Sequence, residues 1–164
     1  MPTSDLSSAE KQAWPELLIW TLALLFLWMR LTDGIDVVGQ SIGFTVVEQS
    51  AARIFDTYLL VGLLAAITLL SVQGYFKSKG EPIEFRDERD LAIERRANQT
   101  AYWVGVFAVQ FVIIHVLANE AFEKNSVATL DLTSATGIVL ALATILLLHE
   151  IARNIAVLVL YKRS

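Results

Sequence analysis

Residues 86–119 read RDERDLAIERRANQTAYWVGVFAVQFVIIHVLAN, a charged run followed directly by an apolar run. Neither Gly nor Pro separates the charged residues 86–96 from the apolar residues that start at Tyr102. Because nothing at this junction breaks a helix, we expect one long helix, half in water and half in lipid. This stretch predicts a membrane protein whose third helix extends into the cytoplasm from about residue 87.

The composition of the 164-residue chain supports the same class. Hydrophobic residues make up 55% of the chain and charged residues 18%, with a mean hydropathy of +0.54. Soluble domains contain about 45–50% apolar and about 25% charged residues. We predict an all-α fold, a four-helix transmembrane bundle that forms a single integral membrane domain over residues 1–164, with consecutive helices as antiparallel neighbours. Its spans are expected at residues 14–31, 54–76, 100–118 and 134–161.

The segments around the first two spans carry further signals. Pro15 suits the first turn of a helix, where its missing N–H costs nothing. In the connection 32–53, Asp33-Gly34 and Gly39 are typical of turns, and the apolar patch Ile42–Val47 is too short to span and suits the membrane interface.

Pairs of small residues predict close contacts between helices. Three such pairs lie in the predicted spans, namely Gly62/Ala66, Ala101/Gly105 and Gly137/Ala141. The sequence does not separate contacts within one chain from contacts between copies, so a homo-oligomer stays open.

Basic residues predict the orientation of the chain. Nine of them lie on the side that holds both termini and the charged segment 77–98: Lys11, Lys77, Lys79, Arg86, Arg89, Arg95, Arg96, Lys162 and Arg163. The other two connections hold Arg53 and Lys124. We therefore expect both the N- and C-termini and the segment 77–98 to be cytoplasmic.

The charged segment is the candidate docking surface for a cytoplasmic partner. The candidate residues are Arg86, Asp87, Glu88, Arg89, Asp90, Glu94, Arg95 and Arg96. Segment 77–98 contains six basic residues and six acidic residues, the latter being Glu81, Glu84, Asp87, Glu88, Asp90 and Glu94. A polybasic lipid-binding segment carries excess positive charge, which this neutral count does not provide. A solvated helix with i, i+4 ion pairs is the favoured alternative to docking.

A second group of candidates is polar or ionisable and lies inside the predicted spans, where such residues usually face protein or water. The group comprises Asp56, Gln110, His115, His149, Glu150 and Arg153. Glu150 and Arg153 are three residues apart on one helix face, so we expect them to pair. The pair is expected to fix helix packing, with a proton or ligand site as the alternative. His115 and His149 are expected at different depths, which excludes a shared metal site.

The sequence contains few features of an enzyme or of a nucleic-acid-binding protein. It contains no cysteine and no nucleophile–base, phosphate-loop, HExxH or dinucleotide motif, so we expect neither an enzyme nor a cofactor. The net charge of −4 argues against direct nucleic-acid binding.

The second half of the chain resembles a family of small bacterial four-helix membrane proteins of unknown function. The residues that carry the resemblance are Asp87-Glu88-Arg89-Asp90, Ile93-Glu94-Arg95-Arg96-Ala97, Thr100, Tyr102-Trp103-Val104, Glu150, Arg153 and Leu160-Tyr161-Lys162-Arg163. Members of that family are often encoded beside small helix-turn-helix regulators. The resemblance thus implies a multi-pass protein of the cell inner membrane with a regulator as its cytoplasmic partner.

Two function hypotheses follow for this chain. The first is an interaction protein of the lipid bilayer that docks a cytoplasmic protein regulator through residues 86–98. The alternative is a small transporter or channel subunit that uses Asp56, His149 and Glu150. We also expect the apolar end of the fourth helix (Ile155, Val157 and Leu158) to cover the Leu91/Ile93 side of the third.

Overall fold

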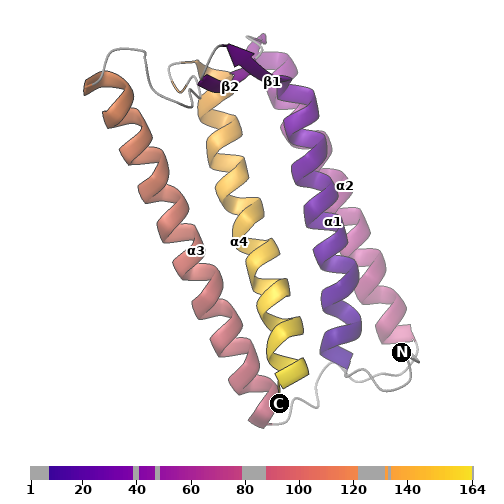
Figure 1. The fold of residues 1–164 in the computed structure, drawn as a ribbon. Helices are drawn as coiled ribbons and strands as arrows, with labels where there is room; N and C mark the ends of the chain where they lie inside the picture. Colours follow the sequence, from indigo (N-terminus) through magenta and orange to yellow (C-terminus); the bar gives the residue numbers. More distant parts are fainter. Residues whose placement is uncertain are drawn as a thin grey trace.

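Four long helices and one β-hairpin make up the part of the chain that the computed structural model describes, namely residues 8–38, 41–46, 49–78, 88–121, 132 and 134–163. The helices are α1 (Ser8–Leu31), α2 (Ala51–Ser78), α3 (Glu88–Ala121) and α4 (Ala135–Arg163), and the hairpin comprises β1 (Thr32–Val38) and β2 (Ser41–Val46) (Figure 1). Each helix contains a stretch that is long and apolar enough to cross a membrane. The prediction of four spanning-length helices is confirmed.

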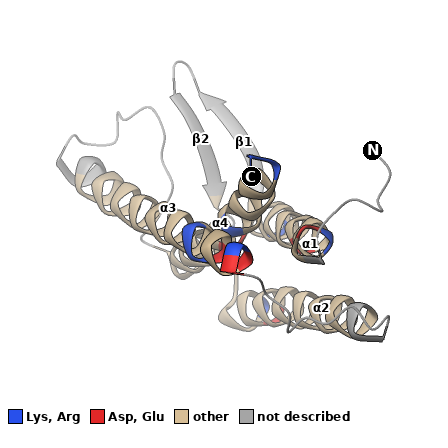
Figure 2. Cartoon of the chain, turned by 90° about the horizontal axis from the view of Figure 1, so that it is seen from below, with Lys and Arg blue, Asp and Glu red and all other residues tan. Residues whose placement is uncertain are grey.

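Helix α4 lies at the centre of the arrangement. It packs against α3 on one side and against α1 on the other, while α2 packs mainly on α1 (Figures 1 and 2). The prediction that consecutive helices are neighbours is therefore wrong for α2 and α3, which do not pack extensively against each other. The physical reason is that α4 buries small residues, among them Gly137, Ala141 and Ala143, which allow close approach on several sides.

The apolar core lies between α1 and α4. Its buried side chains are Leu27, Leu31, Leu140, Ala143 and Leu147. Val61 of α2 and Val46 of β2 pack against this cluster, so the hairpin and the second helix both attach to the α1–α4 pair. Ser134 caps α4 because its Oγ accepts a hydrogen bond from the Gly137 N–H at 3.0 Å.

The hairpin was not predicted. Strands β1 and β2 pair antiparallel, with Ile35 opposite Phe44 and Val37 opposite Ile42. Asp33 and Gly34 lie within β1, where the register shifts between Thr32 and Ile35, so the prediction of a turn there is wrong. β-Branched residues on both strands favour the extended chain, and the Asp-Gly pair is accommodated as an irregularity of the strand. The predicted turn residue Gly39 lies outside the described residues.

Helix α1 begins earlier than the sequence suggested. It starts at Ser8, so Pro15 lies inside the helix and not in its first turn. The polar residues before Pro15 form helix because Ala9, Glu10, Lys11, Gln12 and Ala13 are good helix formers.

Two of the three predicted small-residue contacts are present within the chain. Ala101 is fully buried and Gly105 lies against His149, whose Nδ1 would be 3.6 Å from an added Cβ. Gly137 and Ala141 are both buried. By contrast, no described atom lies within 4 Å of a Cβ added at Gly62, and Ala66 is also exposed. The Gly62/Ala66 pair therefore makes no such contact within the described part of the chain, because α2 turns its Ala65 face toward the bundle, and a contact between copies stays open.

One end of the bundle is rich in charge. Helices α1 and α3 begin there, and α2 and α4 end there (Figure 1). Acidic and basic residues gather where α1, α3 and α4 come together at this end (Figure 2). We call it the charged end; the hairpin lies at the opposite end (Figure 1).

Candidate functional site

Arg153 of α4 is the centre of a polar cluster that joins three helices. Its Nε donates a hydrogen bond to Oδ1 of Asn98 on α3 at 3.0 Å. Its terminal nitrogens lie 3.6 Å from Glu94 of α3, 3.9 Å from Glu150 of α4 and 4.0 Å from Glu16 of α1. The predicted Glu150–Arg153 pair is confirmed, as one contact of a larger arrangement that we call the Arg153 cluster.

The Arg153 cluster holds three carboxylates around one guanidinium. The ion-pair distances exceed the roughly 2.7–2.9 Å of charge-assisted hydrogen bonds. The guanidinium therefore lies between its three carboxylate partners and makes no close hydrogen bond to one of them. The Glu16 side chain is 14% exposed, the most enclosed of the three, while those of Glu94 and Glu150 are 29% and 34% exposed. When every member is ionised, the cluster has two more negative charges than positive ones. Its ion pairs connect α1, α3 and α4.

Two further side chains of α4 make hydrogen bonds in the same region, one within α4 and one to α3. Asn154 is 2% exposed and its amide donates to the Glu150 carbonyl oxygen at 3.0 Å. His149 Nδ1 lies 3.1 Å from the carbonyl oxygen of Ala101. Because a carbonyl oxygen can accept but not donate, the proton of this hydrogen bond belongs to Nδ1. The bond fixes the position of α4 along the axis of α3.

The Arg153 cluster lies near the charged-end limit of the apolar runs of α1 and α3, whereas the apolar residues of α4 continue past Arg153 to Tyr161. Glu16 is two residues from Trp14, the first residue of the apolar run of α1, and Asn98 is four residues before Tyr102. Arg153 is 18 residues from the start of α4, which corresponds to about 27 Å of helix, close to the thickness of a bilayer core. The ends of α3 and α4 beyond this level remain paired with each other.

A second contact joins the start of α3 to the end of α4. The Tyr161 hydroxyl donates a hydrogen bond to Asp90 Oδ1, and the Arg89 guanidinium lies over the Tyr161 ring at 6.0 Å from its centroid. The sequence predicts that the end of α4 covers the Leu91/Ile93 side of α3, and the 6% exposure of Ile93 agrees with this prediction. The prediction is wrong for Leu91 and Ile155, whose side chains are exposed because they face away from the α3–α4 contact.

The structure divides the predicted docking residues into two groups. Asp90 and Glu94 are committed to contacts with α4. Glu88, Arg89, Arg95 and Arg96 are exposed. Arg86 and Asp87 lie outside the described residues. Asp90 and Glu94 remain partly exposed, and the docking role of the eight residues stays a prediction.

The structure does not gather the predicted intramembrane polar residues. His149, Glu150 and Arg153 lie together near the charged end, whereas Asp56 is exposed and lies five residues from the start of α2, near the hairpin. Gln110 is exposed on α3. His115 stacks on Phe111 with ring centroids 6.2 Å apart, and it is 14 residues from Ala101, the contact of His149. This spacing corresponds to about 21 Å of helix, in agreement with the expected difference in depth.

Sequence reasoning missed Glu16 and Asn98. Glu16 is a carboxylate at the start of an apolar run, and such residues usually have a partner inside the protein, which was a usable signal. Asn98 carries no comparable signal, because an amide beside a charged run is ordinary. Its role follows from the register of α3 against α4.

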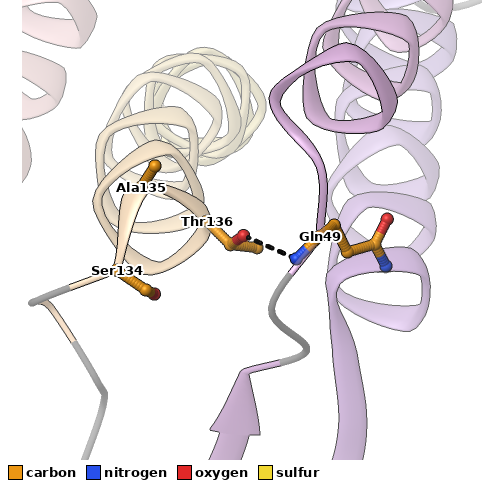
Figure 3. Close-up of a pocket in the computed structure, with 4 residues that line it drawn as sticks. All are labelled: Gln49, Ser134, Ala135 and Thr136. Carbon is orange, nitrogen blue, oxygen red and sulfur yellow. Dashed lines mark hydrogen bonds between the residues drawn. The ribbon is translucent and has the colours of Figure 1, made fainter.

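A pocket of about 300 Å³ lies at the hairpin end of α4, lined by Gln49, Ser134, Ala135 and Thr136 (Figure 3). The Gln49 N–H donates to Thr136 Oγ1 at 3.4 Å, and Gln49 Nε2 donates to the Arg30 carbonyl oxygen at 3.1 Å. The Gln49 amide points away from Ser134 and Ala135 (Figure 3). The Ser134 hydroxyl accepts from Gly137 within the start of α4, and the Thr136 hydroxyl links the start of α4 to the segment before α2.

Among the described residues, no group of three or more His, Asp or Glu side chains has a geometry that could hold a metal ion. No family model, no curated protein and no solved structure matches this chain, so the resemblance of its second half to a family of small bacterial membrane proteins stays a prediction.

Proposed function

We propose that the protein is a multi-pass inner-membrane protein that docks a soluble cytoplasmic protein, such as a helix-turn-helix regulator, at its charged end. The docking surface is the tip formed by the first turn of α3 and the last turn of α4. The carrying observation is the hydrogen bond from Tyr161 to Asp90, which joins these two helix ends into one unit beyond the Arg153 cluster.

Exposed aromatic residues support this placement in a membrane. Trp14 of α1, Tyr75 of α2 and Tyr102 of α3 are 57%, 53% and 60% exposed, and each lies toward the charged end of its helix. Tyr and Trp favour the boundary between lipid and water. The tip lies beyond these rings on α3 and α4, which supports a cytoplasmic extension of α3.

The charge of the tip indicates the kind of partner. Arg89, Lys162 and Arg163 are exposed there beside one exposed carboxylate, Glu88, while Asp90 faces Tyr161. A partner with an acidic surface is therefore complementary to the tip, and such complementarity raises the association rate and selects partners.

A pull-down from the native membrane tests the proposal. The protein carries an N-terminal tag, and the variant K162E/R163E reverses two tip charges without changing Tyr161, Asp90 or Arg89. We expect a soluble protein to co-purify with the parent and to be lost with the variant. The matched control is R30E/R53E, which reverses two exposed basic residues at the hairpin end. Equal recovery of the partner with both variants would overturn the proposal.

The transporter alternative gains no support from the geometry. The hydrogen bond between Gln49 and Thr136 places these two residues at the same level. Asp56 follows Gln49 by seven residues, and Glu150 follows Thr136 by fourteen residues along α4. This difference corresponds to about 10 Å in depth, and Asp56 is also exposed on the outside of α2.

A further inference from the structure

The first half of α3 separates its charges by sign. Asp90 accepts a hydrogen bond from Tyr161 and Glu94 lies 3.6 Å from Arg153, so both carboxylates face α4. Arg95 and Arg96 are exposed on the other side of the helix. The net charge of zero of segment 77–98 therefore does not describe the face of α3 that points away from α4. Glu88 is exposed as well, but it lies seven residues before Arg95, about 10 Å along the helix.

Aromatic side chains follow the two arginines on the same outer face. Tyr102 and Trp103 each lie seven residues after one of these arginines, two helical turns further on. Their side chains are 60% and 50% exposed, and their ring centroids are 5.6 Å apart. Phe107, 69% exposed, follows one turn later with its ring 6.2 Å from that of Trp103.

The order along the helix is thus cationic, aromatic and then apolar. A membrane has the same order along its normal, from phosphate through the interface to hydrocarbon. Arginine suits phosphate in particular, because its planar guanidinium can donate two parallel hydrogen bonds to phosphate oxygens.

We propose that the exposed Arg95/Arg96 face of α3 binds the headgroup phosphate of an anionic phospholipid of the cytoplasmic leaflet. The acyl chains of this lipid lie along Tyr102, Trp103 and Phe107. A lipid fits this face better than a soluble protein does, because the aromatic rings two turns away belong at the membrane boundary. The site is separate from the tip and does not rest on the docking of a protein partner.

Quenching of Trp103 fluorescence by brominated lipids tests the proposal with purified full-length protein in vesicles. Phosphatidylcholine vesicles contain equal fractions of either brominated phosphatidylglycerol or brominated phosphatidylcholine. The signal of Trp103 is obtained as the difference between each protein and its Trp103→Phe version, since the chain has four tryptophans. The variants are R95Q/R96Q and, as a control with the same loss of charge, K162Q/R163Q. Thermal unfolding of each variant checks that it is folded.

We expect the parent to prefer phosphatidylglycerol at Trp103 by about fivefold or more, the attraction that a single arginine near the surface supplies. The preference should disappear in R95Q/R96Q and persist in K162Q/R163Q. Equal quenching by both lipids in the parent, or a preference that survives in R95Q/R96Q, would overturn the proposal. Loss of the preference in both variants would also overturn it, because the attraction would then be a property of the whole charged end. No partner is present in the vesicles, so a failure of the docking proposal does not affect this result.

Discussion

Arg153 donates a hydrogen bond from Nε to Oδ1 of Asn98, 3.0 Å away and 55 positions earlier in the chain. The bond directs the guanidinium across the α3–α4 contact, so that its other nitrogens lie among carboxylates from three helices. One side chain thereby connects α1, α3 and α4 close to the level where the apolar runs of α1 and α3 meet the charged end. Removing it should affect the whole bundle and not one pair of helices.

Arg153→Gln should lower the free energy of unfolding by about 1–2 kcal/mol. The cluster is partly exposed, so its loss should cost more than a surface ion pair and less than a fully buried one. Thermal unfolding in detergent, followed by tryptophan fluorescence, measures the change. Arg95→Gln removes an exposed arginine of α3 and should change stability by less than about 0.5 kcal/mol.

Glu150→Gln separates the role of the arginine from that of its partners. Glu16 and Glu94 remain near Arg153 in this variant, and repulsion among the carboxylates falls. We therefore expect a smaller loss of stability than for Arg153→Gln. If Glu150→Gln were the more damaging change, the i, i+3 pair would be the essential contact and the links to α1 and α3 would be secondary.

Ala101→Leu should disrupt the contact between α3 and α4. Ala101 is fully buried and its carbonyl oxygen contacts His149, so a larger side chain must push the helices apart. Overpacking of this kind costs about 1–3 kcal/mol. Gly105→Ala is the matched control one turn away: its new Cβ would make an ordinary contact 3.6 Å from His149 Nδ1, and Ala favours helix over Gly by about 1 kcal/mol. A melting temperature unchanged by Ala101→Leu would contradict this packing.

The sequence was sufficient to predict the helices but not their neighbours. Apolar run length predicts a spanning helix directly, and all four predicted runs are helical. Which helices touch depends on small differences in side-chain shape between faces that are all apolar. The central place of α4 and the exposed position of Gly62 on α2 were for this reason not predictable from spacing alone.

In the charged segment too, the helix could be predicted from the sequence, but the contacts of its single residues could not. Its sequence predicts a helix correctly, and α3 is continuous from Glu88 through Ala97 to Ala121. A count of charges treats Asp90, Glu94, Arg95 and Arg96 alike. Their roles differ because helical geometry turns the two carboxylates toward Tyr161 and Arg153, which lie far away in the sequence.

Thr144→Val should weaken the contact between α1 and α4. Trp28 Nε1 donates a hydrogen bond to Thr144 Oγ1 at 2.9 Å, and valine has nearly the same shape without the acceptor. The loss should cost about 1 kcal/mol and shift the emission of Trp28, one of the four tryptophans of the chain, so that tryptophan fluorescence measures the change. Thr144→Ser retains the hydroxyl and should keep the parent emission. If serine and valine behaved alike, the hydrogen bond would contribute nothing.

Gly62→Leu and Gly137→Leu should have opposite outcomes, although both glycines belong to small-residue pairs. No described atom lies within 4 Å of a Cβ added at Gly62, so leucine there should face lipid and leave the melting temperature unchanged or higher. Gly137 is buried in α4, where leucine should cost about 1–3 kcal/mol through overpacking. Thermal unfolding and size-exclusion chromatography of both variants in detergent measure the effects. A loss of stability or a change in particle size with Gly62→Leu would show that this face of α2 packs against something other than lipid.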